Sequence, residues 1–521
     1  MKNEGPVNLS TSKVISETLF VSSARIGMNL LKPIRGILLG RLLGPALYGI
    51  LIIPVPYVQI LTMLSNIGFN TAIIKLIPGY RQEGRGDLAR MIYRSSAFMT
   101  LVLSVLWSAA MLIFAKWLAV NVAHQPEAVG PVRIYALIIP FFALNAFYAV
   151  VYLAAQKGKL RAAISVIYGI LNIIIPICVV LWKKNVTYIL GGFLTAEIIG
   201  TILFAVFFHR KILRDFTGHA ASLVRGMKEV FGFGFLFFFA SLGWNIINST
   251  DRIMVKFYLP SEELAFYGMA ALVVTSLSII SATAGTALIP SLAAARTKGD
   301  MALFRKQIWN TSRLGLIALV PMTAILFTLA GDIYQIMLPK FSASASVLRI
   351  LVFIGFIDII CRTAWASLVA FGSGGRAAAA YIIAATLNIA LNIFLIPRYG
   401  IEGAAFATIS SFMVLALILQ IMMSVVAGVR IRIRDLIHPI ILAFIFPVIG
   451  SIFHAAGSYA RVLLVLILGI VIYIILASAT GLIRGKDLEK STEALEKRRG
   501  SVWFNFITGV ISTLYKIGPK R

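Results

Sequence analysis

Long apolar segments separated by short polar ones occupy most of the chain. Apolar runs of about 20 residues, the length needed to cross a hydrocarbon core about 30 Å thick, recur almost from end to end. The pattern predicts an all-α polytopic membrane protein with about fourteen transmembrane helices. The predicted spans are 14–40, 46–76, 91–115, 129–155, 161–182, 186–208, 230–258, 264–292, 308–331, 347–370, 377–396, 401–426, 436–454 and 461–483.

The composition agrees with a membrane protein and not with a soluble domain. Of the 521 residues, 59% are hydrophobic and only 13% are charged, and the mean hydropathy is +0.91. The two cysteines, Cys178 and Cys361, both fall inside predicted spans and lack the spacing of a metal site or a disulfide framework. Because the chain has no Walker-type phosphate loop either, we expect no metal, no cofactor and no direct use of ATP.

The net charge of +28 could suggest a nucleic-acid partner, so the distribution of the basic residues matters. Most Lys and Arg lie in the segments that face the cytoplasm if the N-terminus is inside. This is the positive-inside bias of membrane proteins. It predicts that both termini are cytoplasmic and that the chain resides in the cytoplasmic (inner) membrane, and it leaves no need for nucleic acid.

Three sequence segments recur in the same order along the chain. RGILLGRLLGPALYG (35–49) is echoed by RIMVKFYLPSEELAFYG (252–268), and RGDLARM (85–91) by KGDMALF (298–304). RAAISVIYGILNI (161–173) is echoed by RAAAAYIIAATLNI (376–389). Six spans separate each copy from its partner, so the two halves share one orientation in the membrane. The echoes predict a parallel repeat, a plan found in transporters that rock one half against the other.

The repeat divides the chain into five predicted parts. These are an N-terminal lobe of helices 1–6 (1–208), a cytoplasmic linker (209–229), a C-terminal lobe of helices 7–12 (230–426), an appended pair of helices 13–14 (427–483), and a cytoplasmic tail (484–521). The tail is polar first and then amphipathic. Its apolar residues at helical spacing are Trp503, Phe506, Ile507, Val510, Leu514 and Ile517. We expect a basic helix on the inner membrane surface, or alternatively a docking segment for a partner enzyme.

Basic residues inside the spans are not explained by the positive-inside rule. Those that we single out are Arg25, Lys32, Arg35, Lys75, Arg252, Lys256, Arg313 and Arg362. On helix 1, Arg25, Lys32 and Arg35 fall within an arc of about 80° at 100° per residue, with Asn29 near them. Its repeat partner, helix 7, carries a stripe of similar width formed by Asn245, Asn248, Arg252 and Lys256, with Asp251 to one side. Because lipid cannot solvate such stripes, we predict that the two face a central water-filled cationic cleft.

Two plainer interpretations compete for some of these charges. Lys75 and Lys256 lie near enough to helix ends to snorkel toward water. Asp358 and Arg362, four residues apart, have the spacing of an ion pair within one helix. The remaining four cations cannot all be neutralised by the few acids in the spans. These four are Arg25, Lys32, Arg35 and Arg252. An Arg-rich cleft fits an anion, and phosphate in particular.

Three segments carry a resemblance to a known family. They are LLGRLLGPALYGILIIPVPYVQILTMLSNIGFNTAIIKLIPGYRQEG (38–84), DRIMVKFYLPSEELAFYG (251–268) and LNIALNIFLIPRYGIEGAAFATISS (387–411). Together they resemble the Wzx-type polysaccharide flippases of the multidrug/oligosaccharidyl-lipid/polysaccharide superfamily. PIRG and GRLLG are similar, more loosely, to the first helix of lipid II flippases, where an arginine at the place of Arg35 matters. The chain has Gly36 where those proteins commonly carry an acid.

The resemblance implies a function. Members of this family move undecaprenyl-pyrophosphate-linked oligosaccharides from the cytoplasmic to the outer leaflet for surface polysaccharide biosynthesis. It implies membrane lipid and a lipid-linked oligosaccharide as partners, with polymerases or glycosyltransferases as further candidates, and alternating access coupled to an H⁺ or Na⁺ gradient. The candidate pyrophosphate-binding residues are Arg25, Lys32, Arg35, Arg252, Lys256, Arg313 and Arg362, with Asn29, Asn245 and Asn248 as polar lining. The candidate coupling residues are Glu197, Asp251 and Asp358.

Other functions make different demands on the sequence. A lipid II flippase shares the anionic chemistry and differs only in cargo. A cation or drug antiporter of the same superfamily would need an acid-lined cleft, whereas basic residues predominate here. A non-transporting scaffold has no reason to keep unpaired cations in mid-span. A membrane glycosyltransferase would need acidic catalytic groups at a membrane face, usually in a sizeable loop, so enzymatic activity is not expected.

Overall fold

The computed structural model describes residues 11–213 and 222–482. Of residues 11–30, and of 233, 236 and 237, only the backbone course is described. Throughout these ranges the regular structure is helical, without a strand. Two compact units are present, one formed by Met1–Ile279 with Gly372–Ile418 and the other by Ile280–Phe371 with Leu419–Arg521. The predicted tail 484–521 lies outside the described residues.

The first unit contains most of the helices. They are α1 (Thr11–Ile52), α2 (Pro54–Asn66), α3 (Phe69–Gln82), α4 (Gly86–Ile113), α5 (Ala115–Trp117), the short helices η1 (Leu118–Val122) and η2 (Pro126–Ala128), α6 (Val129–Ala136), α7 (Ile138–Ala154), α8 (Gly158–Trp182), α9 (Val186–Lys211) and α10 (Leu223–Tyr258). The first parts of α11 (Ser261–Thr297) and α15 (Gly374–Ala427) complete it.

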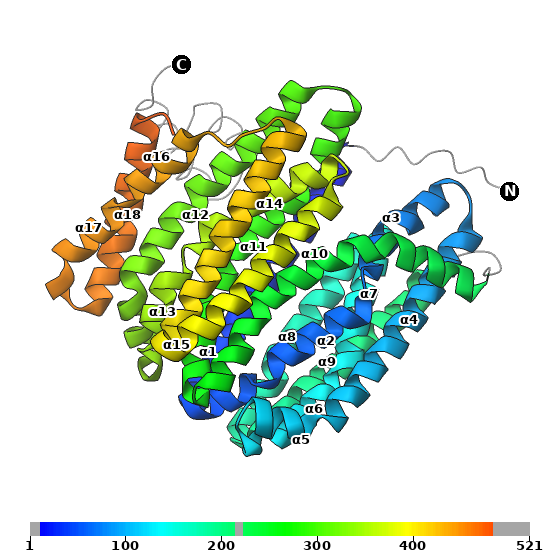
Figure 1. Ribbon diagram of the computed structural model, residues 1–521, viewed down its shortest axis with the longest axis horizontal. Helices are drawn as coiled ribbons and strands as arrows, with labels where there is room; N and C mark the ends of the chain where they lie inside the picture. Colours follow the sequence, from blue (N-terminus) through cyan, green and yellow to red (C-terminus); the bar gives the residue numbers. More distant parts are fainter. Residues whose placement is uncertain (1–10, 214–221, 483–521) are drawn as a thin grey trace. The chain divides into compact units, whose positions relative to one another are not determined.

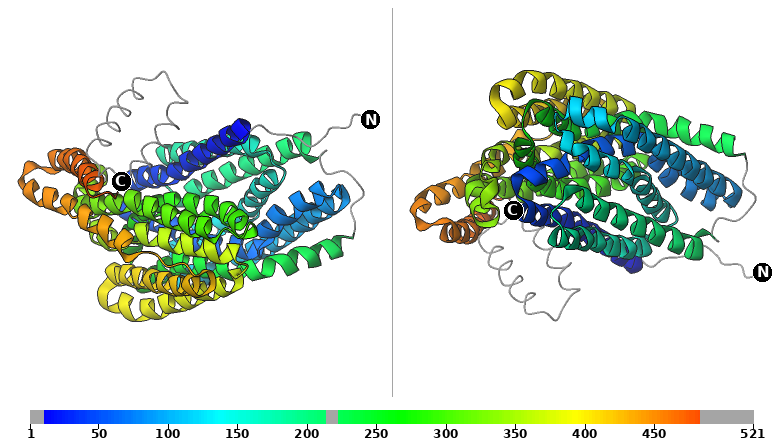
Figure 2. Two further views of the ribbon diagram at one scale, coloured as in Figure 1. Left: turned by 90° about the horizontal axis from the view of Figure 1, so that it is seen from above. Right: turned by 90° about the horizontal axis from the view of Figure 1, so that it is seen from below.

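The second unit takes the remaining parts of α11 and α15 and the helices that follow each of them. These are α12 (Met301–Met337), η4 (Pro339–Phe341), α13 (Ser344–Leu351), α14 (Ile354–Ala370), α16 (Ile433–Ala443), α17 (Ile445–Ile452), η5 (His454–Ala456) and α18 (Ser458–Ala479). Helices α16, α17 and α18 pack against α12, and α17 packs against α18 (Figure 2). The appended helices 13 and 14 of the sequence analysis correspond to α16–α17 and α18.

The predicted all-α membrane fold is confirmed. Twelve helical segments within the described part of the chain are long and apolar enough to cross a membrane. One of them, α15, spans 54 residues and is broken at Gly400, where φ is 59° and ψ is −139°. It therefore covers two predicted spans, 377–396 and 401–426. Helix α10 covers the predicted span 230–258, so each of the fourteen predicted spans corresponds to helix.

Several predicted spans are broken into two helices. The span 46–76 contains the break between α2 and α3 at Gly68, whose φ of 76° favours glycine. The backbone of Gly68 also lies against that of Gly234 on α10: a Cβ on Gly68 would be 2.0 Å from the Gly234 carbonyl oxygen. The glycine pair thus permits both the break and the close approach of α10 to the α2–α3 corner.

The long helices of the first unit pack against one another. Helix α8 lies between α1 and α9, while α7 contacts α4 and α9 (Figure 1). Rings from α4, α7 and α9 meet in the core, where Tyr93 stacks on Phe208 at 4.8 Å between centroids and Phe147 lies 5.8 Å from Tyr93. Helix α10 packs against α2, α3 and α4, and the Tyr80 hydroxyl donates a hydrogen bond to the Glu229 carboxylate. These contacts hold the helix that carries Arg252 firmly against its neighbours.

Candidate functional site

The first polar cluster joins helices α1, α7, α8 and α9. Arg35 on α1 donates from Nη1 to Oδ1 of Asn172 on α8, at 2.7 Å. Asn172 donates from Nδ2 to Oε1 of Glu197 on α9, at 3.3 Å. The Arg35 guanidinium carbon also lies 4.6 Å from the centroid of the Phe193 ring, which is the geometry of a cation–π contact. Asn172 therefore links a predicted anion-binding arginine to a predicted coupling carboxylate.

Glu197 is buried, with 4% of its surface exposed, and its carboxylate accepts hydrogen bonds from three side chains on two helices, α7 and α8. Besides Asn172, the donors are the Tyr168 hydroxyl at 2.6 Å and Asn145 Nδ2 at 2.7 Å. Thr201 extends the cluster by donating to Asn145 Oδ1 at 3.0 Å. A carboxylate away from water requires such donors, because an unsatisfied buried charge is very costly. The cluster thus fixes Glu197 in one orientation.

The second polar cluster surrounds Asp251 on α10. Asp251 is 3% exposed, and its carboxylate accepts hydrogen bonds from Asn392 Nδ2 at 2.6 Å, from the Tyr267 hydroxyl at 2.8 Å and from the Thr408 hydroxyl. Asn392 Nδ2 also donates to Asn388 Oδ1 at 3.2 Å. All of these partners are neutral, and no ion pair involves Asp251 within the described ranges.

The two clusters correspond through the sequence repeat. Asn172 and Asn388 occupy equivalent positions in the echo of 161–173 by 376–389. Each of them belongs to a cluster around a buried carboxylate, Glu197 in one case and Asp251 in the other. The carboxylate itself comes from a different position in each half, since Glu197 is on the sixth predicted span and Asp251 on the seventh.

Arg252 follows Asp251 in α10 and lies on a different face of the helix, toward α2. Its Nη2 donates both to Oε1 of Gln59 on α2, at 3.0 Å, and to the Asn248 carbonyl oxygen, at 2.9 Å. Tyr48 and Tyr135 each lie within electrostatic range of both Arg35 and Arg252. The repeat-equivalent arginines of helices 1 and 7 therefore both act electrostatically on the same two tyrosines.

The other residues of the two predicted stripes differ in their surroundings. Lys32 is exposed and lies within electrostatic range of Arg35 and Glu197. Lys256 is buried, with 4% exposed, and donates from Nζ to the Leu259 carbonyl oxygen at 3.3 Å. It therefore does not snorkel freely to water. The side chains of Arg25 and Asn29 lie outside the described residues.

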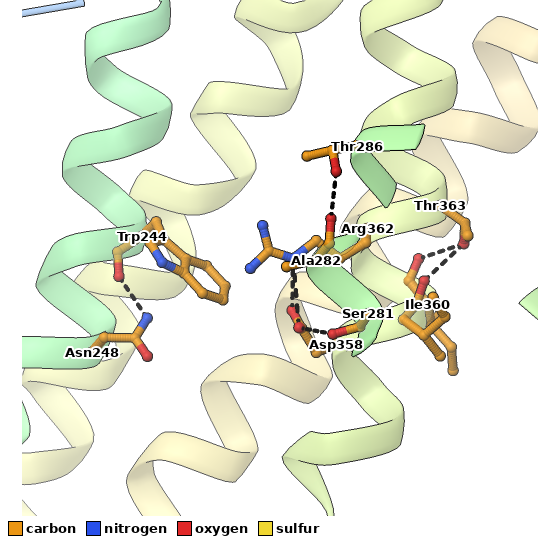
Figure 3. Close-up of polar contacts among 10 residues, drawn as sticks. Trp244, Asn248, Ser281, Ala282, Thr286, Asp358, Ile360, Arg362 and Thr363 are labelled. Carbon is orange, nitrogen blue, oxygen red and sulfur yellow. Dashed lines mark hydrogen bonds and ion pairs between the residues drawn. The ribbon is translucent and has the colours of Figure 1, made fainter. Parts of the chain in front are cut away.

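The two asparagines of the helix 7 stripe bond back to their own helix. Asn245 Nδ2 donates to the Ser241 carbonyl oxygen at 2.8 Å. Asn248 Nδ2 donates to the Trp244 carbonyl oxygen, also at 2.8 Å (Figure 3). Their side-chain oxygens remain as acceptors on the surface of α10. Lys75 is exposed and lies in the middle of α3, so it is not near a helix end as the predicted span 46–76 suggested.

In the second unit, the predicted site residues make contacts within that unit. The expected ion pair within α14 is present: Arg362 Nε lies 3.2 Å from Asp358 Oδ1, and the Ser281 hydroxyl also donates to Asp358 (Figure 3). Asp358 is fully buried, whereas a quarter of the Arg362 side chain is exposed. Arg313 is buried and donates from Nη1 to the Leu482 carbonyl oxygen at 2.7 Å.

Sequence reasoning missed the neutral residues that hold the charged ones. They are Gln59, Asn145, Tyr168, Asn172, Tyr267, Asn388, Asn392 and Thr408. The one available signal was the pair of asparagines in the third echo, Asn172 and Asn388. In the first unit, Lys32, Arg35, Arg252 and Lys256 outnumber the carboxylates Glu197 and Asp251. This excess of cationic over anionic side chains favours an anionic ligand over a cationic one.

Comparisons with known proteins identify the class. Residues 14–295 match the family model described as "Polysaccharide biosynthesis protein". This match covers more than half of the chain, so the chain belongs to that family. It is a multi-pass, flippase-like membrane transporter of the superfamily that its sequence resembles.

Curated relatives agree with this assignment. A Shigella flexneri protein named "Putative O-antigen transporter" is 23% identical over 406 residues, which cover 73% of this chain and 91% of the relative. Stage V sporulation protein B of Bacillus subtilis is 20% identical over 443 residues, covering 80% and 85% of the two chains.

Among solved structures, the lipid II flippase MurJ in its inward closed conformation shares the fold. The TM-score is 0.71 at 15% identity, with 89% of this chain and 99% of that chain covered. At this level of identity the likeness establishes the fold but not the transported molecule.

Proposed function

We propose that the protein flips an undecaprenyl-pyrophosphate-linked oligosaccharide from the cytoplasmic to the outer leaflet, by alternating access, for surface polysaccharide biosynthesis. The observation that carries the proposal is that Arg35 and Arg252, on repeat-equivalent helices, are each held by hydrogen bonds to neutral partners and, in the described part of the chain, not by a carboxylate. A pyrophosphate is the anionic head group whose charge such a pair would balance, while the prenyl chain stays in lipid.

The bonding of the two arginines supports a binding role. The hydrogen bonds of Arg252 to Gln59 and Asn248 both use Nη2, which leaves Nη1 and Nε for a ligand. Arg35 donates one hydrogen bond to Asn172, and its guanidinium lies against the Phe193 ring. Each arginine is thus held in one orientation by neutral partners and keeps donors available. Arg25, Lys32, Lys256, Arg313 and Arg362 are proposed as further residues of the anion path, with Asn29, Asn245 and Asn248 as its polar lining.

Alternating access requires two halves that move. We assign these to the predicted lobes, 1–208 and 230–426, joined by the linker 209–229 and followed by the appended helices 427–483. The cytoplasmic tail 484–521 would lie at the inner surface, where a polymerase or glycosyltransferase could approach. Both termini are then cytoplasmic and the membrane is the inner one, as the distribution of Lys and Arg supports.

Coupling to an H⁺ or Na⁺ gradient is proposed to involve the buried carboxylates. Asp358 is paired with Arg362, and Glu197 lies near Arg35 and Lys32. Asp251 has neutral hydrogen-bonding partners and no ion pair within the described ranges. Because Asp251 is hydrogen-bonded, among the described residues, only by neutral donors, with Arg252 within electrostatic range but not paired to it, we propose it as the first of the three candidates for binding a coupling cation or proton.

The experiment that tests the function is transport in proteoliposomes. Arrival of an undecaprenyl-pyrophosphate-linked oligosaccharide in the distal leaflet is followed by the exposure of its glycan to an added lectin. We expect the wild type to transport it and Arg35→Ala with Arg252→Ala to lose most of the rate. Arg94→Ala, which removes an exposed arginine, is the matched control. Normal transport by the double variant at wild-type protein level would refute the site.

The main alternative cargo is lipid II, which carries the same pyrophosphate. Offering lipid II and the oligosaccharide lipid to the same proteoliposomes separates the two flippases. A cation or drug antiporter is disfavoured because the basic residues of the candidate site outnumber its carboxylates, Glu197 and Asp251. Uptake of a cationic dye that depends on Glu197 or Asp251 would support that alternative instead.

A further inference from the structure

A cavity of about 630 Å³ lies in the first unit, between the segment that follows α4 and the turn between α10 and α11. Its size is in the range of small-molecule binding pockets. Its polar and aromatic lining includes His124, Gln125, Glu127, Lys256, Phe257 and Tyr258. The distribution of Lys and Arg assigns both segments to the outer side of the membrane.

Hydrogen bonds between the two segments shape the cavity. His124 Nδ1 donates to the Phe257 carbonyl oxygen at 3.1 Å, and the Ser261 hydroxyl donates to Gln125 Oε1 at 3.1 Å. His124 has a φ of 45°, which is uncommon for a residue other than glycine. Such backbone strain persists only where the surroundings impose it and is frequent at binding sites. The cavity is thus built from two segments that hold each other.

Aromatic rings form one wall of the cavity. Phe257 and Tyr258 are 43% and 39% exposed, and their rings stand perpendicular with centroids 5.0 Å apart. The His124 ring lies 5.2 Å from that of Phe257. Aromatic side chains exposed in a cavity offer apolar area at low entropic cost. A ligand with flat C–H faces can pack against them.

Hydrogen-bond donors and acceptors lie beside the aromatic rings. Lys256 Nζ has three donors and, within the described residues, one acceptor, the Leu259 carbonyl oxygen. Glu127 and Gln125 supply carboxylate and amide groups, and Gln125 Nε2 lies 3.4 Å from Glu127 Oε2. A ligand that both donates and accepts hydrogen bonds, and that also carries apolar faces, satisfies this mixture. Sugars combine these properties.

The cavity also continues the cationic stripe. Lys256 lies one helical turn beyond Arg252 on α10, about 6 Å further along the axis. In a sugar pyrophosphate the first sugar is bonded directly to the phosphate. A head group held at Arg252 would therefore direct its glycan toward Lys256 and the aromatic wall.

We propose that this cavity is a carbohydrate-binding subsite that recognises the glycan of the transported lipid and contributes to cargo selection. This inference rests on the proposed function for the identity of the glycan. It adds a recognition site beyond the two arginines, made chiefly of the aromatic rings, Gln125 and Glu127, with Lys256 at the junction of the cavity and the anion path.

The test compares two lipids that share undecaprenyl pyrophosphate. One carries the complete repeat unit of the host's surface polysaccharide and the other carries only its first sugar. We expect Phe257→Ala with Tyr258→Ala to slow transport of the complete lipid roughly tenfold, as loss of an aromatic contact does at binding sites, and to change the single-sugar lipid less than twofold. Phe231→Ala with Phe235→Ala is the matched control, because it removes two exposed rings of α10 that do not line the cavity.

Each outcome decides the proposal. Equal slowing of both lipids, or slowing of neither, would overturn it. If the aromatic variant is poorly produced, Gln125→Ala replaces it with the same expectation. If the wild type transports neither lipid, the proposed function fails. Binding of the lipid-free repeat-unit glycan to detergent-solubilised protein then tests whether the cavity binds carbohydrate. Binding that the aromatic variant loses would support the subsite, whereas absence of binding by the wild type would refute it.

Discussion

Arg35 and Glu197 do not contact each other directly but share Asn172. The Asn172 side chain accepts a hydrogen bond from Arg35 at 2.7 Å and donates one to Glu197 at 3.3 Å. An amide is suited to this position because it has an acceptor and a donor on one rigid group. A change in the charge of Glu197 can therefore reach the proposed anion-binding arginine through one residue.

Replacing Asn172 should break the link between Arg35 and Glu197. Asn172→Leu removes the acceptor for Arg35 and one donor to Glu197 while keeping the same branched side-chain shape. Because hydrogen bonds to charged groups contribute about 1.5–3 kcal/mol, we expect a transport rate at least roughly tenfold lower with the protein still inserted. Transport of the labelled lipid in proteoliposomes is the measurement. Asn121→Leu, at an exposed asparagine, is the control and should transport normally.

The contact between Gly68 and Gly234 predicts an asymmetry between two glycines of one helix. A Cβ on Gly234 would be 2.7 Å from the Gly68 carbonyl oxygen, whereas a Cβ on Gly232 would meet nothing within 4 Å. Gly234→Ala should therefore force α10 away from the α2–α3 corner and reduce both thermal stability and transport. Gly232→Ala should be neutral or slightly stabilising, because alanine favours helix. Equal melting temperatures of the two purified variants would contradict this close packing.

Hydropathy predicted the helices well because each long apolar run can satisfy its backbone in lipid only as a helix. The span 186–208 corresponds to α9, Val186–Lys211, and 161–182 to α8, Gly158–Trp182. The internal breaks were not predicted. The break at Gly68 depends on a neighbouring helix, α10, that is more than 150 residues away in the sequence, and no local pattern records such a contact.

The charged residues of the candidate site could be selected from sequence, but their partners could not. Arg252 and Asp251 are adjacent, and the helical projection correctly separated them onto different faces. That Gln59 would hold Arg252, or that Tyr168 would donate to Glu197, depends on the packing of distant helices. Neutral amides and hydroxyls are common throughout membrane helices, so their presence alone selects none of them.

Asp251 provides a test of coupling that leaves the anion site intact. Asp251→Asn removes the charge and turns one acceptor into a donor that faces the donors of Tyr267, Thr408 and Asn392. We expect the response of transport to an imposed H⁺ or Na⁺ gradient to disappear, while slow transport without a gradient persists. Proteoliposomes with and without each gradient give the measurement, and Asp87→Asn, at an exposed aspartate, is the control. A gradient response equal to that of the wild type would exclude Asp251 as the coupling residue.

An ion pair in the second unit predicts how the last helix is attached. Arg461 Nη1 on α18 lies 3.3 Å from Asp332 Oδ2 on α12, and the two side chains are only 18% and 8% exposed. Arg461→Met would leave a nearly buried carboxylate without its counter-charge, at a cost of about 3 kcal/mol, the lower end of the range for breaking a buried ion pair. Adding Asp332→Asn should restore most of the loss, since the uncompensated charge is then removed. Arg349→Met is the control, because Arg349 is exposed and lines, together with Asp332 and Arg461, a cavity of about 440 Å³. Thermal unfolding in detergent should show a lower midpoint for Arg461→Met than for the double variant or the control; equal midpoints would mean that the pair does not hold α18 to α12.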